Sequence, residues 1–193
     1  MNVIVIAEAG VNHNGNLIIA KKLVDVAKLA KADYVKFQTF SHNKLIIRNT
    51  PKASYQKTTK NKKETQNTML KKLELSKLNH LKLIKYCKKK KIKFLSTAFD
   101  IGSLKFLLKN NIDFIKIPSG EITNFPLLEY IKKSNKKILL STGASTLSEV
   151  KTALKILNKK KKEITVLQCN SAYPTPIKHL NLNTLTTFRK KFK

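Results

Sequence analysis

The chain has 193 residues, with 40 Lys and Arg residues against 11 Asp and Glu residues, giving a formal net charge of +29. The length supports one substantial core but falls short of the roughly 250 residues of a complete (β/α)8 barrel. Only Arg48 and Arg189 are arginines, whereas base recognition and planar phosphate recognition favour the guanidinium group, so the composition argues against a dedicated nucleic-acid-binding protein.

The first half of the chain alternates apolar runs with helical patterns. Residues 3–8, 33–39 and 93–97 are short, apolar or β-branched runs that predict strands. Residues 16–31, 76–91 and 102–110 have apolar side chains at helical spacing. Residues 41–75 form a Lys-, Thr- and Asn-rich connection that is too long for an ordinary βα loop, and this length is typical of a lid or a mobile segment.

The second half repeats the alternation. Strands are predicted at 113–117, 137–141 and 164–169, and helices at 124–134, 146–160 and 181–191. The residues suited to helix N-caps are Asn16, Ser76, Asn124 and either Ser145 or Thr146, and Thr146 with Glu149 forms a capping-box pattern. Because the strands are apolar throughout, they indicate a parallel sheet. We predict an α/β fold of the (β/α)8 TIM-barrel type, incomplete, with about six βα units in one domain, 1–193.

Polar residues follow each predicted strand, at the end where such folds bind their ligands. Lys36 lies between Val35 and Phe37, and Lys116 lies between two isoleucines. A charge within a buried strand needs a partner, so two inward lysines imply an anionic ligand. Gln38 lies two positions after Lys36 and therefore on the same face of its strand.

Small hydroxyl side chains occur at the same strand ends. Ser119 and Gly120 can present a hydroxyl and backbone N–H groups to an anion, or they can form only a turn, and Glu121 adds an acid beside them. Thr97 and Ser141 supply hydroxyls at two further strand ends. Each is weak evidence alone, because Ser and Thr are common in turns, and the argument rests on their convergence.

Glu8 ends the first strand within an apolar run. It either pairs with one of the lysines as part of the scaffold or handles a proton, and both can hold. His13 is ambiguous, and the other histidines have no ligand-like spacing with it, so no metal site built from this chain alone is expected.

The remaining features suggest an ordinary intracellular protein. The Lys88–Lys91 and Lys159–Lys162 runs fall where helices should end and suggest solvated faces. Cys87 and Cys169 have no paired spacing, which gives no support for a disulfide framework. No basic leader or membrane-spanning apolar run is present, so we expect a soluble, cytoplasmic protein with no membrane partner.

Taken together, the segments after the strands resemble the sialic acid synthase (N-acetylneuraminate synthase) family in order and spacing. The resemblance covers essentially the whole chain and rests on 6–15, Lys36-Phe37-Gln38-Thr39, Pro51-Lys52-Ala53-Ser54-Tyr55-Gln56, Ser96-Thr97-Ala98-Phe99-Asp100, Lys116-Ile117-Pro118-Ser119-Gly120-Glu121, Leu140-Ser141-Thr142-Gly143 and 169–176.

The resemblance implies an enzyme of surface carbohydrate biosynthesis that condenses phosphoenolpyruvate with an N-acetylmannosamine-type sugar, giving a nine-carbon 2-keto acid and phosphate. Lys116, Ser119, Thr97 and Ser141 would hold the phosphate and carboxylate of phosphoenolpyruvate. Lys36 and Glu8 would lie at the reacting centre, with Glu8 handling the proton. Gln38 and Tyr173 would contact the sugar, Glu121 would lie nearby, and Ser171, where some relatives have Asn, would contact phosphoenolpyruvate.

The resemblance also implies parts that this sequence lacks. The family continues past Pro176 into metal-binding histidines for Mn²⁺ or Mg²⁺ and into a C-terminal antifreeze-like domain, so we expect a truncated synthase domain. A homodimer or a complementing C-terminal chain is the expected protein partner. The alternatives are an inactive or split fragment of such an enzyme and a basic polyanion-binding protein. The sugar, of neuraminic, legionaminic or pseudaminic type, stays open.

Overall fold

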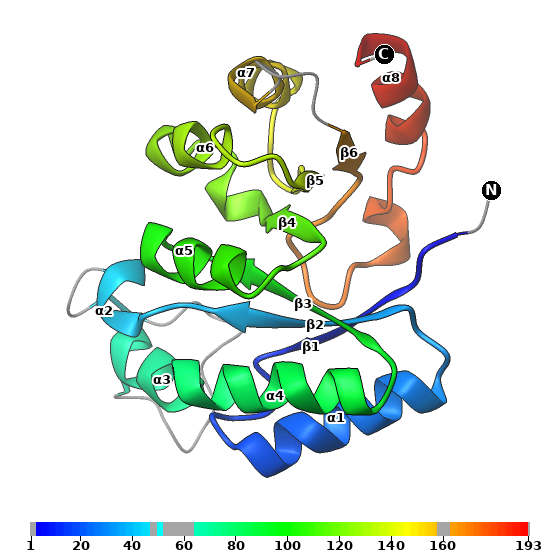
Figure 1. The fold of residues 1–193 in the computed structure, drawn as a ribbon. Coiled ribbons are helices and arrows are strands. Elements are labelled where there is room, and N and C mark those ends of the chain that lie inside the picture. Colours follow the sequence, from blue (N-terminus) through cyan, green and yellow to red (C-terminus); the bar gives the residue numbers. More distant parts are fainter. Residues whose placement is uncertain (1–2, 47–49, 52–63, 158–162, 193) are drawn as a thin grey trace. The chain divides into compact units, whose positions relative to one another are not determined.

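The computed structural model describes residues 3–46, 50–51, 64–157 and 163–192 (Figure 1). The chain divides into two compact units, Met1–Ile112 and Asp113–Lys193, which we call the N-terminal and C-terminal units and describe separately. No helix among the described residues is long and apolar enough to cross a membrane.

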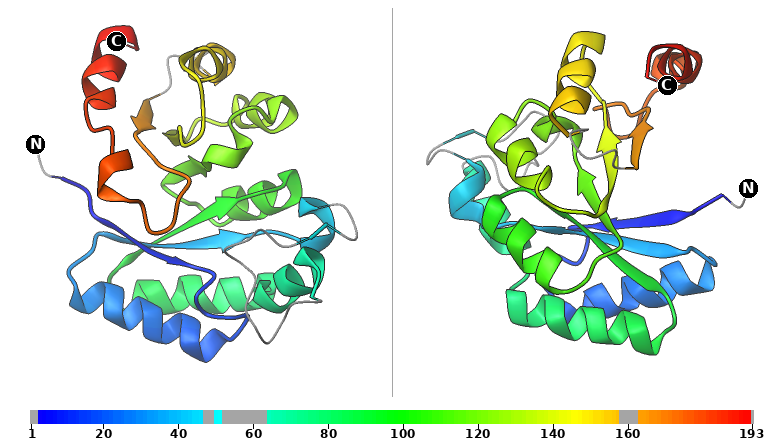
Figure 2. Two further views of the ribbon diagram at one scale, coloured as in Figure 1. Left: turned by 180° about the vertical axis from the view of Figure 1, so that it is seen from behind. Right: turned by 45° about the horizontal axis from the view of Figure 1, so that its top comes forward.

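The N-terminal unit contains three parallel strands. Its elements are β1 (Ile6–Gly10), α1 (Leu17–Leu29), β2 (Tyr34–Thr39), α2 (His42–Leu45), α3 (Gln66–Leu73), α4 (Lys77–Lys89), β3 (Lys93–Ala98) and α5 (Ile101–Lys109). β2 pairs with β1 on one side and with β3 on the other. Helices α1 and α4 lie side by side against one face of this sheet, as Figures 1 and 2 show.

Apolar side chains on that face form the core of the N-terminal unit. Val35 and Phe37 of β2 are fully buried, as are Val24 of α1 and Leu83 of α4. Period-2 alternation along β2 explains the arrangement, because Val35 and Phe37 point to the helices while Lys36 and Gln38 point to the other face. The core thus fixes which face of β2 carries the polar groups.

The C-terminal unit repeats this architecture. Its elements are β4 (Phe114–Ile117), a 3-10 turn (Ser119–Glu121), α6 (Phe125–Ile131), β5 (Lys137–Ser141), α7 (Leu147–Leu157), β6 (Ile164–Leu167), a 3-10 turn (Ile177–His179) and α8 (Thr184–Lys191). β5 is the central strand and pairs in parallel with both β4 and β6. Leu128, Ile138, Leu140 and Leu157 are among its fully buried side chains.

The predicted N-caps are confirmed. The side chains of Asn16, Ser76 and Asn124 accept hydrogen bonds from backbone N–H groups of the first turns of α1, α4 and α6. At the start of α7, Thr146 Oγ1 accepts from Glu149 N, and Glu149 Oε2 accepts from Thr146 N, which is the predicted capping box.

Some predicted element boundaries were wrong. The first strand begins at Ile6, not at residue 3, because its pairing with β2 starts with Ile6 opposite Tyr34 and Val3 is 84% exposed. The sixth ends at Leu167, where its pairing with Ser141 ends. The last predicted helix, 181–191, begins at Thr184. In its described part, the predicted 41–75 connection contains α2 and α3. The Pro51–Gln56 motif beyond Pro51, and the Lys159–Lys162 run, lie outside the described residues.

Candidate functional site

Four of the predicted site residues lie together on the three strands of the N-terminal unit. The strand register places Glu8 of β1 opposite Lys36 of β2, and Gln38 of β2 opposite Thr97 of β3. Because side chains opposite each other in a sheet share a face, the backbone alone gathers this set. We call Glu8, Lys36, Gln38 and Thr97 the β1–β3 cluster.

Lys36 is the centre of the β1–β3 cluster. Its Nζ forms an ion pair with Glu8 Oε2 and donates a 3.4 Å hydrogen bond to Thr97 Oγ1. The Lys36 side chain is 14% exposed, whereas that of Glu8 is 48% exposed. The expectation that a lysine within a buried strand needs a partner is therefore met, and Glu8 is the residue that supplies the charge.

Gly10 leaves room for the acid and the amide of this cluster. Its φ is +53°, and a Cβ at this position would lie 3.2 Å from Glu8 Oε1 and 3.6 Å from Gln38 Nε2. The backbone of β1 thus approaches both side chains closely, and the left-handed conformation favours glycine.

A second cluster lies at the ends of the strands of the C-terminal unit. Lys116 Nζ donates to Ser141 Oγ at 2.6 Å and to the Ile117 carbonyl at 3.0 Å. Cys169 Sγ also donates to Ser141 Oγ, at 3.2 Å. The hydroxyl of Ser141 is buried and accepts from both, so the cation of Lys116 is anchored by neutral oxygens.

Ser119 and Ser171 approach the same cluster from two loops. The backbone N–H of Gly143 donates to Ser119 Oγ at 2.9 Å. A Cβ on Gly143 would lie 2.9 Å from Ser119 Oγ and 3.0 Å from Ser171 Oγ, so both hydroxyls face the space that glycine leaves open. We call Lys116, Ser119, Ser141 and Ser171 the β4–β6 cluster.

Two predicted site residues belong to neither cluster. Glu121 Oε2 accepts a 2.6 Å hydrogen bond from Asn124 Nδ2, so its carboxylate supports the cap of α6. Tyr173 is 85% exposed. The structure therefore does not bring Tyr173 onto the β4–β6 cluster.

The sequence reasoning missed a buried polar group behind the β1–β3 cluster. Thr39 Oγ1 lies 2.7 Å from Ser96 Oγ and 3.0 Å from His80 Nε2, and all three residues are buried. Thr39 and Ser96 belong to two of the sequence motifs, but the spacing of those motifs does not indicate that His80 of α4 would contact them. A polar residue at a core position of the predicted helix was the available signal.

His13 is the other buried histidine. Its Nδ1 accepts from the Gly15 N–H at 3.0 Å, while its Nε2 has no hydrogen-bond partner among the described residues. Burial, with a smaller contribution from the nearby His80, lowers the pKa of His13 to about 4. His13 is therefore neutral at pH 7. Within the described part of the chain no three His, Cys, Asp or Glu side chains are grouped to hold a metal ion.

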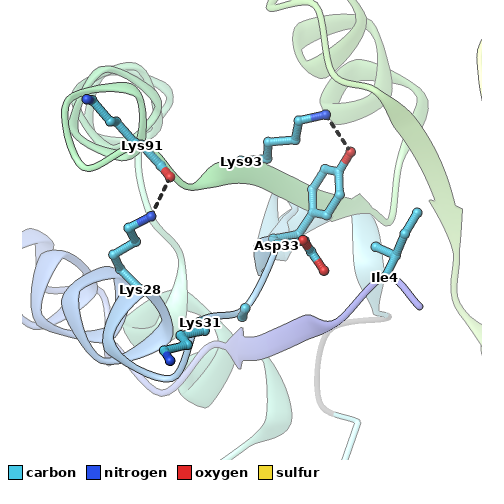
Figure 3. Close-up of a pocket in the computed structure, with 8 residues that line it drawn as sticks. Ile4, Lys28, Lys31, Asp33, Lys91 and Lys93 are labelled. Carbon is cyan, nitrogen blue, oxygen red and sulfur yellow. Dashed lines mark hydrogen bonds between the residues drawn. The ribbon is translucent and has the colours of Figure 1, made fainter. Parts of the chain in front are cut away.

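A pocket of about 500 Å³ lies at the N-terminal ends of β2 and β3, opposite to the ends that carry Gln38 and Thr97 of the β1–β3 cluster (Figure 3). Lys28 Nζ donates to the Lys91 carbonyl, and Lys93 Nζ donates to the Tyr34 hydroxyl. Lys28 lies in the last turn of α1, and Lys91 follows the C-cap of α4, so both stand where positive charge offsets the helix dipole. We interpret these lysines as part of the scaffold.

A second pocket, of about 570 Å³, lies in the C-terminal unit. It is lined by residues of the β5–α7 loop, of the segment after β6 and of α8, including Ser171 of the β4–β6 cluster. The hydroxyl of Ser171 thus lies between the cluster and a cavity large enough for a small molecule.

Comparison with known proteins decides the family. The model of the NeuB family matches residues 23–193. The chain belongs to the NeuB family. All of the β4–β6 cluster and most of the β1–β3 cluster, namely Lys36, Gln38 and Thr97, fall within the matched residues, whereas Glu8 precedes them.

Relatives of this NeuB-family chain are named as synthases. An N,N'-diacetyllegionaminic acid synthase of Campylobacter jejuni is 46% identical over 98% of the chain. The human N-acetylneuraminate-9-phosphate synthase is 31% identical over 97%. The crystal structure of an N-acetylneuraminic acid synthetase from Leptospira borgpetersenii, in complex with citrate, matches the whole chain with a TM-score of 0.85 and 33% identity.

The structural match confirms the predicted fold class, a (β/α)8 TIM-barrel type represented by six βα units. The NeuB-family chain is shorter than these relatives. It spans 58% of the Campylobacter protein, 52% of the human protein and 62% of the Leptospira chain.

Proposed function

We propose that this chain carries the phosphoenolpyruvate-binding part of a sialic-acid-type synthase, which condenses phosphoenolpyruvate with an N-acetylmannosamine-type sugar. The observation that carries the proposal is the β4–β6 cluster. There Lys116 and three serines come together at the ends of strands and in the loops that follow them, and Lys116 donates to the Ser141 hydroxyl and to the Ile117 carbonyl. Such a group suits a small, multiply charged anion.

In this proposal the two clusters have different tasks. Lys116, Ser119 and Ser141, with Ser171 beside them, bind the phosphate and the carboxylate of phosphoenolpyruvate, and Thr97 is proposed to contact the same substrate. Binding neutralises the charge and orients C3 of the substrate for attack on the aldehyde of the open-chain sugar. Lys36 and Glu8 serve at the reacting centre, while Gln38 contacts the sugar.

The reaction balances with one water molecule. C3 of phosphoenolpyruvate bonds to the aldehyde carbon, the aldehyde oxygen takes a proton, water adds at C2, and phosphate leaves to give the 2-keto acid. Glu8 is suited to proton transfer because its carboxylate is half exposed and is anchored to Lys36. Tyr173 would reach the sugar only from a different position, because it is largely exposed.

We also propose, from the resemblance, that turnover requires Mn²⁺ or Mg²⁺, which would polarise the aldehyde. The described residues do not fit such an ion, because they offer no group of three suitable ligands. Phosphate release is therefore to be compared with and without the ion.

Binding of phosphoenolpyruvate tests the proposal directly. Calorimetric titration of the 193-residue protein should show saturable binding that is lost in Lys116→Ala, whereas Lys155→Ala on α7 is the control for a general loss of positive charge. Phosphate release is then measured with N-acetylmannosamine-type sugars, with and without Mn²⁺. Absence of phosphoenolpyruvate binding, or binding that both variants reduce equally, would refute the proposal.

A binding-only fragment is the second candidate, and the short span relative to the matched synthases favours testing it. It predicts phosphoenolpyruvate binding without phosphate release. Turnover should then appear on addition of the C-terminal part of a relative. The sugar is tested in the same assay, with legionaminic-type and neuraminic-type precursors side by side.

A further inference from the structure

A chain of three buried polar side chains lies directly behind the β1–β3 cluster. Thr39 and Ser96 project from β2 and β3 toward the helices, on the face opposite to Gln38 and Thr97. His80 of α4 meets them from the helix layer, with its Nε2 3.0 Å from Thr39 Oγ1. The three residues are 4%, 1% and 1% exposed, respectively.

The direction of each hydrogen bond follows from one anchor. His80 Nδ1 lies 3.1 Å from the backbone carbonyl of Ser76, which can only accept, so Nδ1 carries the proton. In a neutral ring Nε2 is then an acceptor and Thr39 donates to it. Thr39 has one proton, so Ser96 must donate to Thr39 Oγ1. The tautomer is assigned from these partners.

Burial keeps this histidine neutral. It lowers the pKa of His80, although the carbonyls of Ser76, Gln38 and Leu75 and the charge of Glu74 act in the opposite direction. The carbonyl of Gln38 therefore faces His80 from one side, while the side chain of Gln38 belongs to the β1–β3 cluster. Contact with the ring of Phe106, 6.0 Å away between centroids, fixes the imidazole from α5.

Stability alone does not explain these groups. Their neighbours in the same layer, such as Phe37 and Leu83, are fully buried and apolar. Replacing a buried hydrogen-bonded set by apolar residues of the same shape is often neutral or stabilising. A directional hydrogen-bond chain does what an apolar contact cannot, because it sets distance and angle between two strand ends.

We propose that His80, Thr39 and Ser96 form a positioning relay that fixes the ends of β2 and β3 and thereby places Gln38 and Thr97 for ligand binding. Ser96 immediately precedes Thr97, and Thr39 immediately follows Gln38. The residues of the relay act through Gln38 and Thr97 and are not proposed to touch the ligand. Its role in phosphoenolpyruvate binding rests on the proposed function.

A matched pair of variants tests the relay. Thr39→Val keeps the shape and removes the hydroxyl, whereas Thr39→Ser keeps the hydroxyl. We expect Thr39→Val to weaken phosphoenolpyruvate binding roughly tenfold, the equivalent of about one well-placed hydrogen bond. Thr39→Ser should stay within about twofold of wild type on the same scale. Leu83→Val in α4 is the control, expected to lower stability without changing affinity.

Nitrogen NMR of the His80 ring and the amide resonances of Gln38 and Thr97 provide a readout that needs no ligand. We expect the proton on Nδ1, amide shifts in Thr39→Val and their return in Thr39→Ser. If wild type fails to bind phosphoenolpyruvate, the proposed function fails and these resonances alone decide the relay. A proton on Nε2, unshifted amides in Thr39→Val, or unchanged affinity in that variant would overturn the relay.

Discussion

Gly143 gives the sharpest test of the β4–β6 cluster. In Gly143→Ala the new Cβ would lie 2.9 Å from Ser119 Oγ and 3.0 Å from Ser171 Oγ, closer than such contacts allow. Both oxygens end short side chains that can rotate away, so the backbone need not move. The hydrogen bond from the residue 143 N–H to Ser119 Oγ is then lost.

Gly143→Ala should have a small effect on stability and a large effect on binding. Loss of one hydrogen bond costs about 1 kcal/mol. Replacing glycine by alanine in the unfolded chain returns about 0.4–1 kcal/mol, and the φ of Gly143 is outside the left-handed region. We therefore expect the free energy of unfolding to change by less than about 1 kcal/mol. Displacing two ligand hydroxyls should weaken phosphoenolpyruvate binding by roughly tenfold or more.

Gly120 supplies the matched control, because a Cβ there would meet no atom within 4 Å. Gly120→Ala should leave affinity unchanged, although it lies beside Ser119. Calorimetric titration with phosphoenolpyruvate and urea unfolding of both variants check this. Equal affinities for Gly143→Ala and wild type, or an equal loss in Gly120→Ala, would refute the reasoning about this cluster.

Three further outcomes are expected. The pKa of His13 is lowered from 6.5 to about 4, so only the unfolded chain takes up this proton between those pH values, and stability should fall by on the order of 3 kcal/mol as pH drops from 6.5 to 4. Between pH 7.5 and 4.5, urea unfolding should show a smaller fall in the free energy of unfolding for His13→Gln than for wild type. The fall that remains in the variant is due to His80, whose pKa is also lowered. Thr146→Ala removes the cap of α7 and should cost about 1 kcal/mol in the same measurement, and no loss would show that the cap is dispensable. Glu8→Gln should change stability by less than about 1 kcal/mol, because the Glu8 carboxylate is half exposed and the glutamine oxygen can still accept from Lys36. It should also tighten phosphoenolpyruvate binding, because the positive charge of Lys36 is no longer neutralised by Glu8; weaker binding would contradict this reasoning.

The sequence was sufficient to predict the fold because the relevant signals were local. Continuous apolar runs indicated parallel strands, and side-chain caps such as Asn124 marked where helices begin. The ends of elements were less predictable. Val3, Ile4 and Val5 have strand-forming side chains, but pairing begins only at Ile6, so tertiary register overrode local propensity.

The sequence was sufficient to predict that the two lysines of the site have partners, but it was not sufficient to predict contacts between distant elements. A charge between apolar neighbours, as at Lys36 and Lys116, must find a partner, and each lysine has one in the structure. Which residue of a distant element becomes a partner could not be predicted. His80 joins Thr39 across 41 positions of sequence, and nothing in the spacing of either motif encodes that contact.

The two lysines also differ in the contacts that the structure gives them, and this difference suggests different roles. Lys36 is paired with the Glu8 carboxylate, a group that can carry a proton, which suits the reacting centre. Lys116 donates to the hydroxyl of Ser141 and to a backbone carbonyl in a cluster that also holds Ser119 and Ser171. An ammonium group among several hydroxyls suits a phosphate or a carboxylate. Lys116→Ala should therefore abolish phosphoenolpyruvate binding, whereas Lys36→Ala should weaken it less and impair turnover more.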